Sequence, residues 1–155
     1  VPMLIGCFIM GPAAGVMMEF LKILLNFLIN ATMTAGVGEL ANFLIGCALV
    51  VPAGMLYRMR KTRKQAIIGM AVGTLCMAVV GGVLNAFVLL PAYAAAFGGM
   101  DAIIAMGTAV NGSISGLSTF VLFAVVAFNL LKGIQVSIVT FILYKYVSRV
   151  MIHND

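Results

Sequence analysis

Long apolar runs, separated by short polar or glycine-rich breaks, make up almost the whole chain. The runs cover residues 1–10, 12–30, 40–57, 65–90 and 117–148. Runs of roughly 20 residues, the length that crosses a bilayer core as a helix, recur along the chain. Because backbone amides within lipid must be satisfied internally, helices are favoured there. The pattern therefore predicts an all-α, polytopic membrane protein.

Two of the apolar stretches contain a break or a bend. Residues 1–29 are too long for one untilted crossing at about 1.5 Å per residue, and "GPAAG" at 11–15 places Pro12 where a helix breaks. We therefore expect the tail of one crossing before Pro12 and a second crossing after it. The last run is also too long for one straight helix, so we expect a bend or a partly embedded part near its start. Residues 91–116 are less apolar and predict a long loop.

Composition excludes a soluble domain. Of the 155 residues, 64% are hydrophobic and 8% are charged, whereas soluble domains are about 25% charged. We therefore expect a single transmembrane domain over residues 1–155. No P-loop pattern occurs, and no nucleophile and base are paired at membrane depth, so neither ATP hydrolysis by this chain nor another enzymatic activity is expected. The scattered Cys residues and the single His153 do not predict a metal site.

The distribution of cations predicts the orientation. Five of the nine lysines and arginines fall in "RMRKTRK" at 58–64, and short basic loops stay cytoplasmic. Lys145 and Arg149 indicate that the C-terminus is cytoplasmic as well. The stretch 65–148 must then cross the membrane an even number of times. Residues 30–39 and 91–116 are expected on the outer side.

Charged residues inside the apolar runs need a partner or a cavity, because a charge at the bilayer centre costs about 2.5–3.5 kcal/mol. Glu19 and Lys22 are three residues apart and can pair on one helix. Glu39 follows "GVG" at the start of a run. There its carboxylate either caps the helix, where the dipole favours negative charge, or faces a ligand.

Lys132, within "FNLLKG" at 128–133, has no acidic residue within helical reach. Either it extends to the outer interface, or it points with Asn129, at i−3, into an internal polar cavity. Asn85 is the other amide at membrane depth, and Tyr93 could add a ring and a hydroxyl. A cavity with these donors and apolar walls suits an uncharged ligand with a flat ring and several hydroxyls.

Four stretches carry a resemblance to a known family. They are "VPMLIGCFIMGPAAG" at 1–15, "GVGELANFLIG" at 36–46, "VLNAFVLLPAY" at 83–93 and "VLFAVVAFNLLKG" at 121–133. The chain resembles the substrate-binding S components of energy-coupling factor (ECF) vitamin transporters, and in particular the riboflavin-specific type. The resemblance implies a fold of six transmembrane helices with both ends cytoplasmic. The first helix and the outer loop after it are expected before Val1, so the chain is expected to begin inside a larger protein. Where members often have proline, this chain has Ala127.

The resemblance also implies a function. Asn129 and Lys132 would hydrogen-bond riboflavin, with Asn85, Tyr93 and Glu39 as further candidates for the same pocket and Asn111 as part of a cover over it. Riboflavin would be the transported ligand and no cofactor is implied. The partners would be a transmembrane coupling subunit and two cytoplasmic ATPase subunits in a bacterial cell membrane, with no nucleic acid. Two alternatives stay open, an S component for a different vitamin and a structural membrane protein without a ligand.

Overall fold

The computed structural model describes residues 1–29 and 36–152, except for the side chains of 96–97 and 147–152. Helices joined by short connections make up this part of the chain, and it contains no strand. The N-terminal half forms α1 (Pro2–Met10), α2 (Pro12–Ile29) and α3 (Val37–Met59). Gly11 separates α1 from α2 with φ 99°, a left-handed conformation that glycine adopts without a Cβ clash. The break predicted at "GPAAG" is therefore confirmed.

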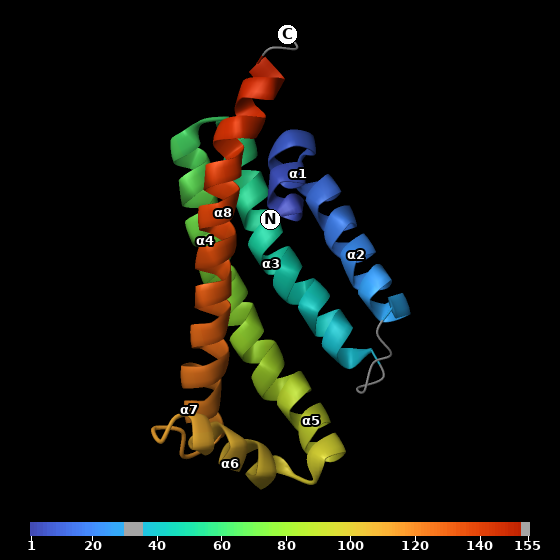
Figure 1. Ribbon diagram of the computed structural model, residues 1–155, viewed down its shortest axis with the longest axis vertical. Coiled ribbons are helices and arrows are strands. Elements are labelled where there is room, and N and C mark those ends of the chain that lie inside the picture. Colours follow the sequence, from blue (N-terminus) through green and yellow to red (C-terminus); the bar gives the residue numbers. More distant parts are fainter. Residues whose placement is uncertain (30–35, 153–155) are drawn as a thin grey trace.

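The second half contains two long, continuous helical segments (Figure 1). The first comprises α4 (Arg63–Leu84), a π-helical stretch η1 (Asn85–Leu89) and α5 (Leu90–Phe97). Thr62 caps it, since its Oγ1 accepts from the Gln65 N–H at 3.3 Å. The second comprises α7 (Leu117–Phe120), the π-helical stretch η2 (Val121–Val126) and α8 (Ala127–Ile152). Near the start of the last run, where a bend or a partly embedded part was expected, the helix contains this wide π-helical stretch.

The prediction of a loop over 91–116 was wrong for most of its length. Residues up to Phe97 continue the preceding helix as α5, and α6 spans Met100–Val110. Pro91 is accommodated because the wide turn of η1 precedes it, which removes the clash that a proline ring makes with an α-helical carbonyl four residues earlier. Alanine-rich composition favours helix even where hydrophobicity is lower. Of the predicted outer loop 30–39, residues 30–35 lie outside the described residues.

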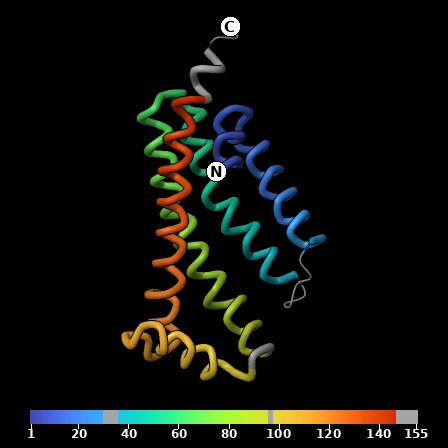
Figure 2. The backbone as a smooth tube through the Cα atoms, in the orientation of Figure 1, coloured from blue at the N-terminus to red at the C-terminus, as the bar shows by residue number. Residues whose placement is uncertain are grey.

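The helices form a bundle in which α3 packs between α2 and α4, and α4 packs against α8. In Figures 1 and 2, α4 and α8 run side by side along the long axis of the molecule, and α6 crosses its lower end. Buried side chains of α1, α3 and α4 make up the core, among them Leu4, Leu49, Val50, Ala53 and Met77.

Glycines allow α3 and α4 to approach closely. A Cβ on Gly69 would lie 2.7 Å from the Ala53 carbonyl oxygen, and one on Gly73 would meet the Leu49 carbonyl oxygen. This small-xxx-small pair is the kind of sequence that brings membrane helices into backbone contact. The small residues of 69–82 therefore serve internal packing at these two positions.

An aromatic cluster joins α1, α3 and α8 near the α3–α4 connection. The hydroxyls of Tyr57 and Tyr144 lie 2.6 Å apart in a hydrogen bond. The Phe8 ring packs on Tyr57 with centroids 4.6 Å apart and lies edge-on to Tyr144 at 6.2 Å. This cluster closes the interior of the bundle at that end.

Four helical segments among the described residues are long and apolar enough to span a membrane: 12–29, 37–59, 63–95 and 117–146. The α3–α4 connection, which carries the basic loop, lies at the same end of the molecule as the end of α8, and α6 lies at the opposite end (Figure 1). This arrangement agrees with the even number of crossings predicted from the cation pattern.

Candidate ligand-binding site

The residues of "FNLLKG" face two different neighbours. Asn129 is only 4% exposed, and its side-chain nitrogen lies 2.6 Å from the place that a Cβ on Gly81 would occupy. One turn further along α8, Gly133 lies against Thr74 of α4. Asn129 and Gly133 therefore hold α8 close to α4, while the intervening Lys132 is half-buried on another face.

The two predicted membrane-depth amides meet at Gly81. The Asn85 Nδ2 donates to the Gly81 carbonyl oxygen at 2.7 Å, and the Asn129 Nδ2 donates to the Val125 carbonyl oxygen at 3.0 Å. Val125 belongs to η2 and Asn85 begins η1, where a π-helical turn alters the usual backbone ladder. A side-chain amide carries two N–H donors and one carbonyl acceptor. These bonds therefore leave each asparagine one N–H and its Oδ1.

Lys132 lines an internal cavity of about 200 Å³ between α1, α2, α3, α4 and α8. Leu4, Leu49, Val50, Met77 and Val136 form apolar walls, and Glu19, Lys22 and Asn42 add polar groups. Within residues 1–29 and 36–152, no carboxylate lies at ion-pair distance from Lys132. Lys132 thus lines a cavity, as one of the two interpretations expects, but Asn129 does not line it with Lys132.

Glu19 and Lys22 form the predicted ion pair on α2. The Glu19 carboxylate is 2% exposed and packs on Gly46 of α3, where a Cβ would collide with it. The pairing was predictable from the spacing, but its position on the wall of the Lys132 cavity was not. Asn42 was also missed, although it follows Glu39 by one helical turn in "GELANF".

Glu39 lies in the first turn of α3 and is half-buried. Its Oε2 atom is buried and has no hydrogen-bond partner among the residues that the structure describes. A buried, unpaired carboxylate oxygen is costly, so this atom is a candidate acceptor for a ligand hydroxyl or N–H.

Tyr93 and Asn111 lie on the far side of η1, toward the end of the molecule that α6 crosses. Tyr93 is half-buried on α5. Asn111 ends α6, and its Oδ1 accepts from the Ser113 N–H at 3.0 Å, which closes a local turn. Neither residue lines the Lys132 cavity, and the same is true of Asn85, Asn129 and Glu39.

A larger groove of about 790 Å³ adjoins the cavity on the α1–α2 side. The two share Met3, Lys22 and Asn42, and the rest of the groove is mainly apolar, with Met18, Leu21, Leu25 and Ile29. Pockets for drug-sized ligands measure about 300–1,000 Å³. The inner cavity alone is smaller than that, whereas cavity and groove together provide enough space for such a molecule.

The polar groups of the cavity suit binding and orientation of a ligand. No group of three or more potential metal ligands occurs among the described residues. The cysteines are free, with Cys7 buried and Cys47 and Cys76 half-buried in helices.

Known proteins are similar to this chain in sequence and in fold. The model of the family "ECF transporter, substrate-specific component" matches residues 1–144. The chain is 35% identical over 145 residues to the riboflavin transporter RibU of Staphylococcus aureus (strain TCH60), a match that covers 94% of this chain and 70% of that protein. It is 31% identical over 140 residues to the riboflavin transporter FmnP of Bacillus subtilis (strain 168), covering 90% of this chain and 68% of that protein.

Among solved structures, the S component of a bacterial ECF transporter superposes with a TM-score of 0.70 at 34% sequence identity, over 97% of this chain and 75% of that one. Sequence, helical architecture and family match agree over nearly the whole chain. The chain belongs to the family of substrate-specific components of ECF transporters.

Proposed function

We propose that this substrate-binding membrane subunit binds riboflavin for uptake. The family makes the chain a transporter component and not an enzyme. Both curated relatives described above are riboflavin transporters. The observation that carries the proposal is the cavity around Lys132, which combines charged and amide groups with apolar walls at membrane depth.

The chemistry of the cavity matches the two parts of riboflavin. Its hydroxylated ribityl chain and ring carbonyls need donors and acceptors, while its flat ring system needs apolar walls. Lys132 would donate to an oxygen of the vitamin, and Met3, Leu49 and Met77 would contact the ring. The lysine acts as a hydrogen-bond donor in this proposal, and no covalent step is involved.

Residues on three helices would complete the site. The Asn129 and Asn85 amides lie beside Gly81, outside the lining of the Lys132 cavity, and each retains one N–H and one carbonyl oxygen that would bind a ligand extending to them. The buried Oε2 of Glu39 would accept from a ribityl hydroxyl or a ring N–H. Because unpaired buried polar groups are costly, an analogue that lacks the matching groups would bind less well.

Tyr93 and Asn111 would contribute at the end that α6 crosses. In this proposal the segment from α5 to α7 forms part of a cover over the vitamin, and Tyr93 on α5 belongs to it. The local turn that Asn111 closes would fix the shape of the connection after α6.

The proposed transport scheme follows from the proposed orientation of the chain in the membrane. With the basic loop 58–64 and the C-terminus in the cytoplasm of a bacterial cell, the α5–α6 end faces outward and captures riboflavin there. A transmembrane coupling subunit and two cytoplasmic ATPase subunits would supply the energy, because this chain carries no phosphate-binding loop. Riboflavin is then the cargo and not a cofactor.

Replacement of Lys132 tests the proposal. The full-length protein is purified from a riboflavin-replete host, denatured, and its absorption spectrum is recorded for released flavin. Riboflavin is also titrated into ligand-free protein and its fluorescence quenching is followed. Lys132→Met is expected to raise the Kd about 10–150-fold, because hydrogen bonds to charged groups contribute about 1.5–3 kcal/mol.

Lys64→Met removes a cation from the exposed basic loop and serves as the matched control. It is expected to bind riboflavin as the unmodified protein does. A protein that carries no flavin and does not quench riboflavin would overturn the proposal. Binding of another vitamin would then indicate an S component of different specificity. The absence of saturable binding of any vitamin would favour a structural role.

A further inference from the structure

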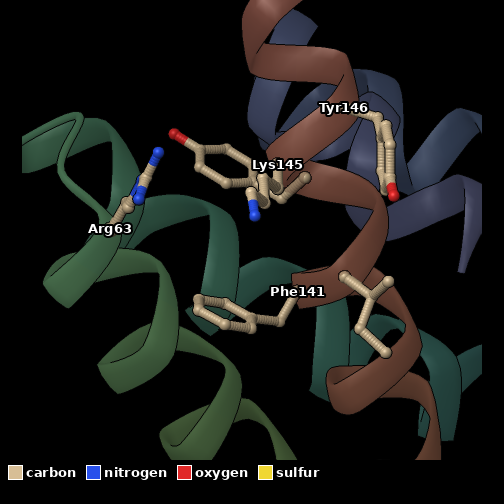
Figure 3. Close-up of a pocket in the computed structure, with 6 residues that line it drawn as sticks. Arg63, Phe141, Lys145 and Tyr146 are labelled. Carbon is tan, nitrogen blue, oxygen red and sulfur yellow. The ribbon is translucent and has the colours of Figure 1, made fainter.

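A second cavity lies at the opposite end of the bundle from α6, beside the basic loop. Its volume is about 440 Å³, and it is lined by Arg63, Phe141, Ile142, Tyr144, Lys145 and Tyr146. In Figure 3, the side chains of Arg63, Lys145 and Phe141 converge in the space between α4 and α8, and Tyr146 points away from Arg63. Two cations from different helices therefore border one pocket.

An apolar groove continues from this pocket along the same helix pair. It measures about 580 Å³ and shares Phe141 and Ile142 with the cationic pocket. Ile67, Ala71, Leu75, Leu130, Ile134 and Ile138 form most of its remaining surface. The cationic pocket and the apolar groove are thus continuous along one face of α4 and α8.

The position of the pocket limits what can occupy it. Arg63 opens α4 and belongs to the basic stretch 58–64, which holds five of the chain's nine cations, so the pocket faces the cytoplasmic leaflet by the positive-inside rule. That leaflet is rich in anionic lipids, and basic pockets between transmembrane helices on this side bind lipid head groups. Tyrosine and phenylalanine side chains suit this interfacial depth.

We propose that this face binds one anionic phospholipid of the inner leaflet. Its phosphate lies between Arg63 and Lys145, and one acyl chain follows the groove past Phe141 toward Ala71 and Leu130. The site is separate from the proposed vitamin cavity, since the two share no lining residue. The lipid connects the first turn of α4 to the last turns of α8, and Tyr144 links it to the aromatic cluster through Tyr57.

Native mass spectrometry of the purified full-length protein tests this proposal. The protein is reconstituted with phosphatidylglycerol, with phosphatidylcholine, or with inorganic phosphate, and retained adducts are measured as collision energy rises. The unmodified protein is expected to keep one phosphatidylglycerol, and neither phosphatidylcholine nor phosphate should be retained to the same energy. The double variant Arg63→Gln, Lys145→Gln is expected to bind phosphatidylglycerol about 30-fold more weakly, because each cation near an anionic surface contributes about 1 kcal/mol.

A control variant has the same change of charge outside the pocket. Lys61→Gln, Lys64→Gln removes two exposed cations of the basic loop that do not line the cavity, and it should retain phosphatidylglycerol. Equal loss in both double variants would show a general charge effect and overturn the proposal. Retention of phosphatidylcholine as strongly as phosphatidylglycerol would also overturn it, as would binding of phosphate alone in place of lipid.

A substitution in the groove keeps the test valid if the charge variant fails to fold. Ala71 is exposed on the groove surface, so Ala71→Phe fills the path of the acyl chain without altering charge or core packing. Lipid retention is expected to fall, with the helical circular dichroism spectrum unchanged. Full retention in a folded Ala71→Phe protein would contradict the acyl-chain placement.

Discussion

Thr140 shows how a single buried atom limits stability. The residue is 0% exposed on α8, and its Oγ1 has no hydrogen-bond partner among the described residues. Leaving such a group unpaired costs about 1–3 kcal/mol. Valine has nearly the same shape and lacks the hydroxyl.

We therefore predict that Thr140→Val stabilises the protein. A gain of about 1 kcal/mol should raise the Tm by about 2–4 °C for a chain of this size, measured by thermal unfolding in detergent. Thr140→Ser keeps the hydroxyl and loses the methyl group, so it should lower the Tm. A lower Tm for the valine variant would show that the hydroxyl has a partner.

Individual site residues were predictable where the sequence placed polar groups against an apolar background. Lys132, Asn129 and Asn85 stand out for this reason, and Lys132 does line a polar cavity. Their neighbours were not predictable, because the contact of Asn129 with Gly81 depends on which helices pair. The same is true of Glu19, whose position on the cavity wall follows from the packing of α2 on α3.

At the scale of secondary-structure elements, the contact between α3 and α4 depends on glycine. A Cβ at position 73 would meet the backbone carbonyl of Leu49, which cannot move aside as a flexible side chain could. Gly73→Ala should therefore push the two helices apart and destabilise the fold by about 1–3 kcal/mol. The measurement is the Tm of the purified variant beside that of the unmodified protein.

Gly112→Ala is the matched control for this prediction. A Cβ at Gly112 would have no neighbouring atom within 4 Å, so the Tm should stay within a degree or so. Equal Tm values for Gly73→Ala and the unmodified protein would show that the helices tolerate greater separation.

The predicted boundaries of the helices were close to the observed ones in strongly apolar stretches. They were wrong where the chain is less apolar. The predicted run 40–57 became α3 at 37–59, and 12–30 became α2 at 12–29. Residues 91–116 were assigned to a loop because they are less apolar, yet α5 and α6 lie there. The sequence around η1 and η2 is almost entirely apolar, so no periodic pattern of polar residues reveals a π-helical turn. These widened turns could therefore not be predicted.

The topology of the whole molecule predicts which surfaces are reached from each side. Lys61 is exposed in the basic loop, and Gly112 is exposed in the connection after α6 at the opposite end. In intact cells, a membrane-impermeant maleimide should label Gly112→Cys. It should label Lys61→Cys only after the cells are permeabilised.

The unmodified protein supplies the background of this experiment, since its three cysteines lie within helices, with Cys7 buried and Cys47 and Cys76 half-buried. Labelling of Lys61→Cys in intact cells would show that the chain has the opposite orientation in the membrane. It would also place the proposed lipid pocket in the outer leaflet and the proposed vitamin cavity on the cytoplasmic side.

The π-helical stretch η2 has a genetic consequence. A π-helical turn accommodates one residue more than an α-helical turn over the same span, and each residue of an α-helix turns the side chains after it by about 100°. Deletion of one codon within 121–126 would therefore let a regular α-helix cover the same span and leave Asn129, Lys132 and Gly133 facing their present neighbours. In a regular α-helix the same deletion would turn all three side chains by about 100°, so the extra residue of η2 makes the direction of "FNLLKG" tolerant of a one-residue loss at this point.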